Sequence, residues 1–280
     1  MGNVRLIVVV VCLALSAGCA ALSDRTTSAS VPFVTTPHKV VREMLKLADV
    51  TQEDLVYDLG SGDGRIVIAA ARTFGARAVG VEIDPKLVKE SEENAEKAGV
   101  GDRVRFLEQD IFQTDLRDAT VITMFLLPGV NAMLAPKFMN ELSPGTRIVS
   151  HMFDMGEWQP DRTTYVGIST LHYWVVPADI DGTWRFELPF TAGPKPVELF
   201  IRQAYQKLTG WLRIDGRKLT LVDPRIEGAR LSFSTEGAID GQATRMLFSA
   251  TASNRRLAGR VEVTGGPRAG PYDFDASPTR

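Results

Sequence analysis

The sequence predicts an α/β protein in two parts: an open, Rossmann-like sheet with helices on its faces, followed by a small antiparallel, barrel-like all-β domain. A glycine-rich turn joins a short apolar strand to an apolar helix-length run near residue 60, as in a β-α-β unit. Strand-length and helix-length runs then alternate to about residue 180. From residue 181 the runs shorten and are separated by Asp-Gly and Gly-Gly turns, which is typical of antiparallel β structure.

Composition limits the classes of function. The chain has 280 residues, 44% of them hydrophobic, and a formal net charge of -2. This length suffices for one large domain or two modest ones. Because the chain has no overall excess of basic residues, no nucleic-acid partner is expected. Both cysteines, Cys12 and Cys19, lie near the N-terminus, which leaves no cysteine nucleophile in the folded part. The scattered His38, His151 and His172 predict no metal site.

Residues 1–30 are expected to be a signal or anchor segment with a polar linker. Leu6 to Ala17 is an apolar run of 12 residues, too short for a comfortable membrane span and typical of a bacterial export signal. Ala17-Gly18-Cys19 resembles a lipoprotein cleavage site, although Ser16 stands where a larger aliphatic residue is usual. An uncleaved anchor is the alternative. We therefore expect a bacterial, membrane-associated protein, with the cytoplasmic and periplasmic faces both open.

Residues 31–180 are predicted to form the α/β domain. Its first helix is expected to begin with Thr36 as N-cap and Pro37 as first helical residue, and Asp84-Pro85 has the same form. A helix after residue 128 is expected to be interrupted at Pro136. The predicted helices are 37–48, 66–74, 86–98 and 128–142. The predicted strands are 56–58, 78–83, 103–107, 119–127, 146–151, 163–168 and 171–176, with one of the last two antiparallel.

Residues 181–280 are predicted to form the all-β domain, whose role stays open. About eight short strands suggest a barrel or sandwich, and a tail from Pro267 is expected to fray after Phe274. The predicted strands are 184–188, 197–206, 208–214, 218–222, 230–234, 244–252 and 257–263.

The turn at residues 60–64 indicates a site for S-adenosylmethionine (SAM). Its glycines have the spacing G-x-G-x-G, and Arg65 stands where the third glycine of the NAD fingerprint should be. Asp58, two residues before the first glycine, suits a ligand with an ammonium group, which SAM carries. Glu82 follows at the end of the second strand, where an acid can accept both ribose hydroxyls. The cofactor-binding residues expected in and around this turn are Thr36, Asp58, Gly60, Ser61, Gly62, Gly64 and Glu82.

The ends of the other strands supply the remaining candidates. Asp110 can accept the adenine amino group, with Ile83 and Ile111 on the two faces of the ring. The methyl acceptor is expected at the carboxyl end of the fourth strand, at Leu127 and Pro128. In the segment after the fifth strand, His151, Asp154 and Glu157 are the candidate catalytic residues, with Asp154 preferred, and Trp158 can hold a cation on its ring face.

Four motifs resemble those of class I SAM-dependent methyltransferases. They are VPFVTTP at residues 31–37, YDLGSGDGR at 57–65, GVEIDP at 80–85 and MFDMGEW at 152–158. More narrowly, residues 31–178 resemble the mitochondrial lysine N-methyltransferases that act on the ATP synthase c-subunit and related carriers, with their bacterial relatives. This resemblance implies SAM binding through Asp58, Gly60, Gly62, Glu82 and Asp110, with protein lysine as the acceptor. The export-like leader and the β domain depart from the mitochondrial enzymes.

We therefore expect a SAM-dependent enzyme that methylates a protein lysine. Two alternatives remain from the residues alone. A small-molecule methyltransferase would use every SAM residue and differ only in its acceptor pocket. A non-catalytic SAM-binding or lipid-binding envelope protein would tend to lose Asp58 or Glu82, and both are present.

Overall fold

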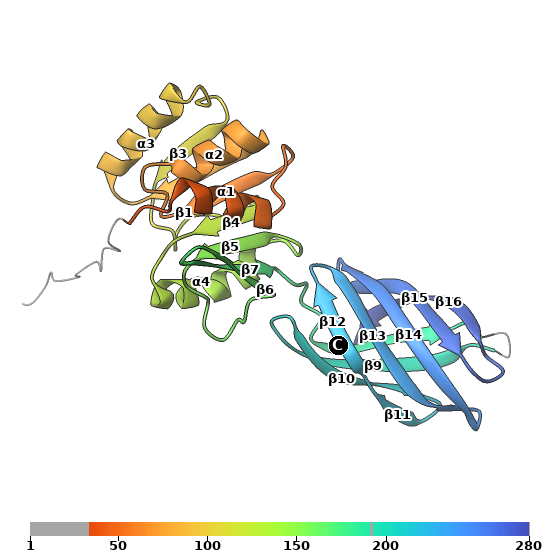
Figure 1. Cartoon of the computed structure of the whole chain (residues 1–280). Coiled ribbons are helices and arrows are strands. Elements are labelled where there is room, and N and C mark those ends of the chain that lie inside the picture. The colour runs from red at the N-terminus through yellow and green to blue at the C-terminus, as the bar shows by residue number, and fades with distance from the viewer. Residues whose placement is uncertain (1–33, 191–192, 280) are drawn as a thin grey trace, which may run out of the picture. The chain divides into compact units, whose positions relative to one another are not determined.

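The protein contains a seven-stranded, mostly parallel sheet, seen in a computed structural model that describes residues 34–190 and 193–279 (Figure 1). Its strand order is β3-β2-β1-β4-β5-β7-β6. Strands β1 to β5 are parallel, whereas β7 runs against both of its neighbours, β5 and β6. One antiparallel strand was predicted, and it is β7. The strands are β1 (Leu55–Leu59), β2 (Arg77–Glu82), β3 (Val104–Glu108), β4 (Val121–Met124), β5 (Arg147–His151), β6 (Arg162–Val166) and β7 (Ser169–Val175).

Helices cover both faces of this sheet. They are α1 (His38–Leu47), α2 (Arg65–Phe74), α3 (Pro85–Lys97) and α4 (Pro128–Glu141). Successive residues of a strand point to opposite faces, so Val121 of β4 belongs to the hydrophobic cluster that includes α1 and α2. Its neighbour Ile122 belongs to the cluster that includes Leu134 and Phe138 of α4. The mostly apolar sequence of β4, in which only Thr123 is polar, follows from this burial on both faces.

Three local predictions for this part are wrong. Helix α1 has Pro37 rather than Thr36 at its N-cap position, without a side-chain cap, because the Thr36 hydroxyl has another partner, described below. Helix α4 runs through Pro136 without interruption. Proline there removes one backbone hydrogen bond, but the buried residues Leu134, Ala135 and Phe138 hold the helix on the sheet. Strand β4 stops at Met124, three residues before the predicted end.

The direction of the strands defines two edges of the sheet. Strands β1 to β5 all end at one edge, which we call the carboxyl edge. The turn between β6 and β7 lies at the same edge, because Leu171 of β7 pairs with His151 at the end of β5. Strand β7 then returns the chain to the opposite, amino edge, where Val175 pairs with Arg147. Residues 176–181 therefore leave the sheet at the edge opposite to the glycine turn.

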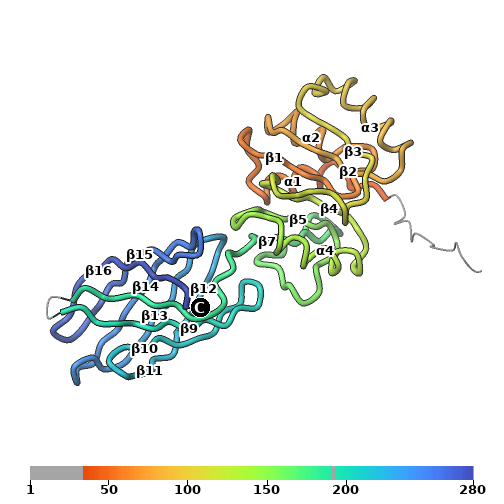
Figure 2. Tube along the Cα trace, turned by 180° about the vertical axis from the view of Figure 1, so that it is seen from behind, coloured from red at the N-terminus to blue at the C-terminus, as the bar shows by residue number. Residues whose placement is uncertain are grey.

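The C-terminal strands form a closed antiparallel barrel, seen from two sides in Figures 1 and 2. The sheet order is β11-β10-β12-β13-β14-β15-β16-β8-β9, and pairing of β9 with β10 closes the ring. Its interior is packed with side chains that include Phe186, Phe233, Phe248 and Phe274. The strands are β8 (Gly182–Leu188), β9 (Lys195–Ala204), β10 (Lys207–Ile214), β11 (Arg217–Thr220), β12 (Val222–Glu227), β13 (Arg230–Ile239), β14 (Gln242–Ser253), β15 (Arg256–Thr264) and β16 (Gly270–Pro278).

Two barrel strands, β12 and β16, are absent from the prediction. Strand β12 was missed because Asp223 and Pro224 interrupt the apolar alternation, and the register shifts there between Val222 and Arg225. The tail does not fray after Phe274. Strand β16 continues to Pro278, because its end is held by pairing with Trp184 of β8.

The predicted leader, with Cys12 and Cys19, lies outside the described residues. Within residues 34–190 and 193–279, no helix has the length and hydropathy needed to cross a membrane.

Candidate functional site

Neighbouring side chains lie so close to the glycine turn after β1 that they leave little room for a Cβ atom. Gly60, Gly62 and Gly64 have φ angles of 75°, 55° and 79°, which glycine adopts without steric cost. A Cβ on Gly60 would lie 2.8 Å from Leu126, and one on Gly64 would lie 2.8 Å from Phe106. Gly64 is also the N-cap residue of α2, so the helix presents its free N–H groups at this turn.

Glu82 ties this turn to the end of β2. Its Oε2 accepts a hydrogen bond from the Gly62 N–H at 2.9 Å. Its Oε1 accepts from the N–H groups of Ile83 and Asp84 at 2.8 and 3.0 Å. The carboxylate is thus fixed beside the turn, and Oε2, which accepts only one of these bonds, can accept a further hydrogen bond from a ligand hydroxyl. Asp84 caps α3 by accepting the Lys86 N–H at 2.9 Å, as predicted.

Asp58 is a buried carboxyl group at the end of β1. It is 2% exposed, and its Oδ1 accepts a hydrogen bond of 2.7 Å from the Thr123 hydroxyl. Burial raises the pKa of Asp58 to about 7, opposed by the Thr123 hydrogen bond and increased by the charges of Glu82 and Asp63. A cation bound beside it would lower this pKa again. The position of the Asp58 carboxyl group therefore suits it to bind an ammonium group of a ligand.

These residues fit the predicted cofactor. SAM carries an ammonium group for Asp58 and ribose hydroxyls for Glu82. The Ser61 hydroxyl is a further observation, because it is buried in this turn and has no hydrogen-bond partner within the protein. Buried polar groups normally have a partner, and a ligand in the turn can supply one.

The segment before α1 closes the other side of the site. The Thr36 hydroxyl is hydrogen-bonded to Nδ1 of His151, 3.1 Å away. The Thr36 carbonyl accepts a hydrogen bond of 2.9 Å from the guanidinium of Arg65, whose Nε also donates to Asp63 at 2.8 Å. Thr36 therefore joins the glycine turn to the end of β5. From the sequence, Arg65 was notable only because it replaces a glycine of NAD sites. No local pattern predicts its contact with Thr36, which lies 29 residues earlier in the chain.

The His151 ring is buried in a way that favours its neutral form. It is 3% exposed, its ring lies 4.1 Å from that of Phe125, and burial lowers its pKa. Its Nε2 is buried and has no hydrogen-bond partner within the protein. This nitrogen is available to a ligand.

The loop after β5 is held by a residue that the sequence analysis missed. Asn131 of α4 is fully buried, and its amide donates hydrogen bonds to the Ser150 hydroxyl at 3.1 Å and the Phe153 carbonyl at 3.0 Å. Asp154 is exposed, and its Oδ1 accepts the Gly156 N–H at 3.0 Å. Glu157 is exposed as well. The two acids are thus presented at the surface by an anchored loop.

Trp158 does not lie where its predicted role requires. Its side chain is fully buried and is stacked on Tyr205, with ring centroids 5.4 Å apart and planes at 3°. Its carbonyl accepts a hydrogen bond from Nε1 of Trp174 at 2.9 Å. A fully covered ring offers no face to a substrate cation, so Trp158 is a packing residue. The neighbouring residues do not predict that Trp158 is buried, because they are mostly polar or typical of turns.

The remaining candidates lie at the carboxyl edge. Ile83 is 62% exposed, as a residue that covers a ligand ring can be, and Leu127 is 41% exposed. Ile111 packs partly against the core. Asp110 accepts the Phe112 N–H at 2.9 Å through one oxygen, Oδ1. Pro128 is the first residue of α4.

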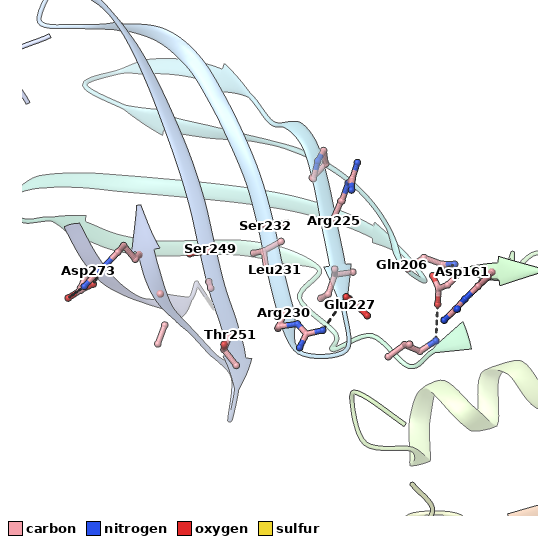
Figure 3. A pocket seen from close by; sticks show the side chains of 18 of the residues that line it. Asp161, Gln206, Arg225, Glu227, Arg230, Leu231, Ser232, Ser249, Thr251 and Asp273 are labelled. Carbon is pink, nitrogen blue, oxygen red and sulfur yellow. Dashed lines mark hydrogen bonds and ion pairs between the residues drawn. The ribbon is translucent and has the colours of Figure 1, made fainter. Parts of the chain in front are cut away.

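A large groove lies elsewhere on the molecule. It has a volume of about 1240 Å³, and its lining residues include none of those just described. Figure 3 shows its polar side chains, among them the ion pair of Arg230 with Glu227. Asp161 and Val175, which also line it, lie at the start of β6 and the end of β7, and so at the amino edge of the sheet. The groove is therefore distinct from the candidate cofactor site.

Comparisons with known proteins agree with this geometry. A family model described as the ANTKMT methyltransferase domain matches residues 58–162. A protein-lysine N-methyltransferase of Saccharolobus islandicus is 49% identical over 52% of this chain and 91% of its own. The lysine N-methyltransferase of Mus musculus that is named for the ATP synthase c-subunit is 37% identical over 50% of this chain and 56% of its own length. This chain thus spans little more than half of that mouse relative.

One solved structure is also similar. It is described as an RNA methyltransferase from Salinibacter ruber in complex with S-adenosyl-L-homocysteine, which is SAM without its methyl group. It is 56% identical and covers 52% of this chain and 96% of its own, with a TM-score of 0.52.

Proposed function

This chain belongs to the ANTKMT family of SAM-dependent methyltransferases, and we propose that it methylates the ε-amino group of lysine in a protein. The observation that supports a lysine acceptor is the negative charge of a loop at the carboxyl edge. The loop at residues 152–159 contains Asp154 and Glu157 and no lysine or arginine, and both acids are exposed. An acidic loop attracts a cationic side chain and repels phosphate. The archaeal relative, named a protein-lysine N-methyltransferase, supports the same acceptor.

SAM supplies a methyl group on a positively charged sulfur; when the amine forms its C–N bond, the C–S bond breaks and the electron pair stays on sulfur. The residues of this chain must hold the amine in line and without its proton. A free lysine is protonated at neutral pH, so it must lose its proton before it attacks, and a carboxylate at the entrance can orient the ammonium and accept this proton. We propose Asp154 for this role. The neutral ring of His151 adds no positive charge that would repel the acceptor.

The test is transfer of labelled methyl from SAM by the purified full chain, with lysate of a strain that lacks it as the acceptor mixture. We expect a labelled product that is destroyed by protease, and mass spectrometry should place the methyl group on lysine. An Asp58→Asn variant, which removes the charge for the SAM ammonium group, serves as the inactive control.

Two results would overturn the proposed acceptor. Label destroyed by ribonuclease would indicate an RNA acceptor, in line with the description of the Salinibacter protein. Label found only in the organic extract would indicate a small molecule or lipid. SAM binding without transfer to any fraction would count against an enzyme.

We also propose that the leader attaches the enzyme to a membrane through lipid on Cys19. The support is the sequence Ala17-Gly18-Cys19 after an apolar run. Cells fed with labelled palmitate should incorporate label into the wild-type chain and not into Cys19→Ser. Equal labelling of the two proteins, or none in either, would contradict acylation of this cysteine.

A further inference from the structure

Exposed apolar side chains of the α/β part gather at the carboxyl edge. Ten large hydrophobic residues are exposed in the described part of the chain, and eight of them precede residue 180. Scattered exposed apolar residues are ordinary, but a group of them marks a binding surface. The eight lie in the segment before α1, after the ends of β2 to β5, near the start of α4, or at the β6–β7 turn: Val34, Ile83, Phe112, Leu127, Met133, Met152, Tyr165 and Ile168.

The most exposed of these residues lie on the β6–β7 hairpin, which Figure 1 shows at the margin of the sheet. Ile168, in the turn, is 98% exposed, and Tyr165, near the end of β6, is 73% exposed. Tyr165 pairs with Thr170, whose carbonyl accepts a hydrogen bond of 2.7 Å from the Met152 N–H. Met152 directly follows His151. We call Met152, Tyr165 and Ile168 the apolar tip.

The charged residues near the apolar tip indicate which kind of partner it binds. Residues 152–159 and 163–170, which contain the three tip residues, include the acids Asp154 and Glu157 and no lysine or arginine. Anionic lipid surfaces attract basic residues and repel acids, and nucleic acid does the same. The charge of the loop that carries Met152 is therefore complementary to a cationic polypeptide.

We propose that the apolar tip binds apolar residues beside the acceptor lysine, so that the enzyme selects lysines flanked on one side by large apolar side chains. The lysine then meets the acids of the loop after β5, while its apolar neighbours cover Tyr165 and Ile168. Covering Ile168, which is 98% exposed, removes apolar surface from water and so favours a substrate with apolar neighbours of the lysine. This inference rests on the proposed lysine acceptor.

The test compares two double variants of the full chain. Tyr165→Ser with Ile168→Ser removes the tip, and Val222→Ser with Leu247→Ser is the matched control, because these residues are 40% and 52% exposed on the barrel. With lysate protein at limiting concentration, we expect the tip variant to lose at least tenfold in kcat/KM for protein-lysine labelling. Its Kd for SAM should stay within twofold of wild type, as should both quantities for the control.

A competition experiment gives a second measurement. A synthetic peptide with one lysine followed by leucines should inhibit labelling by the wild-type enzyme, and the same peptide with serines should not. The tip variant should be inhibited equally weakly by both.

The possible failures are separable. If the wild-type enzyme labels no protein lysine, the proposed function itself fails. If it labels lysine and the tip variant does so within twofold of the control, only this inference is overturned. Loss of binding to phosphatidylglycerol vesicles by the tip variant, with labelling retained, would also overturn it and assign the tip to a lipid surface.

Discussion

The hydroxyl of Thr36 lies 3.1 Å from Nδ1 of His151, although 115 positions separate the two residues in the chain. The bond joins the segment before α1 to the end of β5, and Arg65 holds the same threonine from the glycine turn. The N-terminal segment is therefore fixed on two sides of the cofactor site.

Loss of this bond should weaken SAM binding. A hydrogen bond between uncharged groups contributes about 0.5–1.5 kcal/mol, so Thr36→Val should raise the Kd for SAM roughly two- to tenfold, measured by titration calorimetry. The chain contains a matched control, because Thr163 and His172 are also 3.1 Å apart but exposed. Thr163→Val should leave the Kd unchanged, and an equal effect of both variants would contradict a special role of Thr36.

Asp58 should give stability and ligand affinity opposite dependences on pH. Its pKa is about 7 in the folded protein and 3.8 in its unperturbed state. Between these values the folded state holds a proton that the unfolded state has lost, so the free energy of unfolding should fall as pH rises toward 7. Affinity for SAM should rise over the same range, because the ionised carboxylate binds the ammonium group.

The Asp58→Asn variant tests both dependences. It should lose most of its SAM affinity, and its unfolding free energy in urea should lack the fall between pH 5 and 7 that Asp58 causes. A pH dependence identical to that of the wild-type protein would show that another group is responsible.

Asp154→Asn should separate catalysis from cofactor binding. Asparagine can still accept the Gly156 N–H through its side-chain oxygen, so the loop should keep its conformation. We expect kcat to fall at least tenfold while the Kd for SAM is unchanged. Glu157→Gln, an exposed acid of the same loop, is the comparison. If Asp154→Asn keeps its turnover, Asp154 does not receive the proton.

Trp158→Ala should act on stability. Truncation of a fully buried tryptophan typically costs about 3–5 kcal/mol, and here it also removes the stacking on Tyr205. Urea denaturation should show this loss, and Trp158→Phe should lose less. If Trp158→Ala instead keeps its stability and loses only acceptor binding, the packing role is wrong.

The parts of this fold that were predictable have local causes. The turn at Gly60, Gly62 and Gly64 requires positive φ angles, and the Asp84 cap bonds a residue two positions away, so neighbouring residues are sufficient to predict both. The parts that were missed depend on distant partners. Thr36 has the pattern of an N-cap until His151 competes for its hydroxyl, and nothing near Asn131 indicates that it holds the loop after β5.

The barrel shows the same division. Its short strands were predictable from alternation and Gly turns, but the end of β16 depends on a partner strand, β8, that lies almost 100 residues earlier in the sequence. Pro224 made β12 unrecognisable, because proline in a strand usually argues against one. Pairing with β13 holds β12, and pairing with β8 holds the end of β16, so neighbouring strands override both local signals.

The reversed direction of β7 has a consequence for how such proteins can diversify. Because β7 carries the chain back to the amino edge, whatever follows residue 178 is attached where none of the loops of the candidate SAM site begin. Recombination at this point can exchange the C-terminal module while the methyl-transfer machinery is inherited, provided that the new module covers Trp158 as Tyr205 does here. The junction near residue 178 is accordingly the natural place to graft a different module in protein engineering.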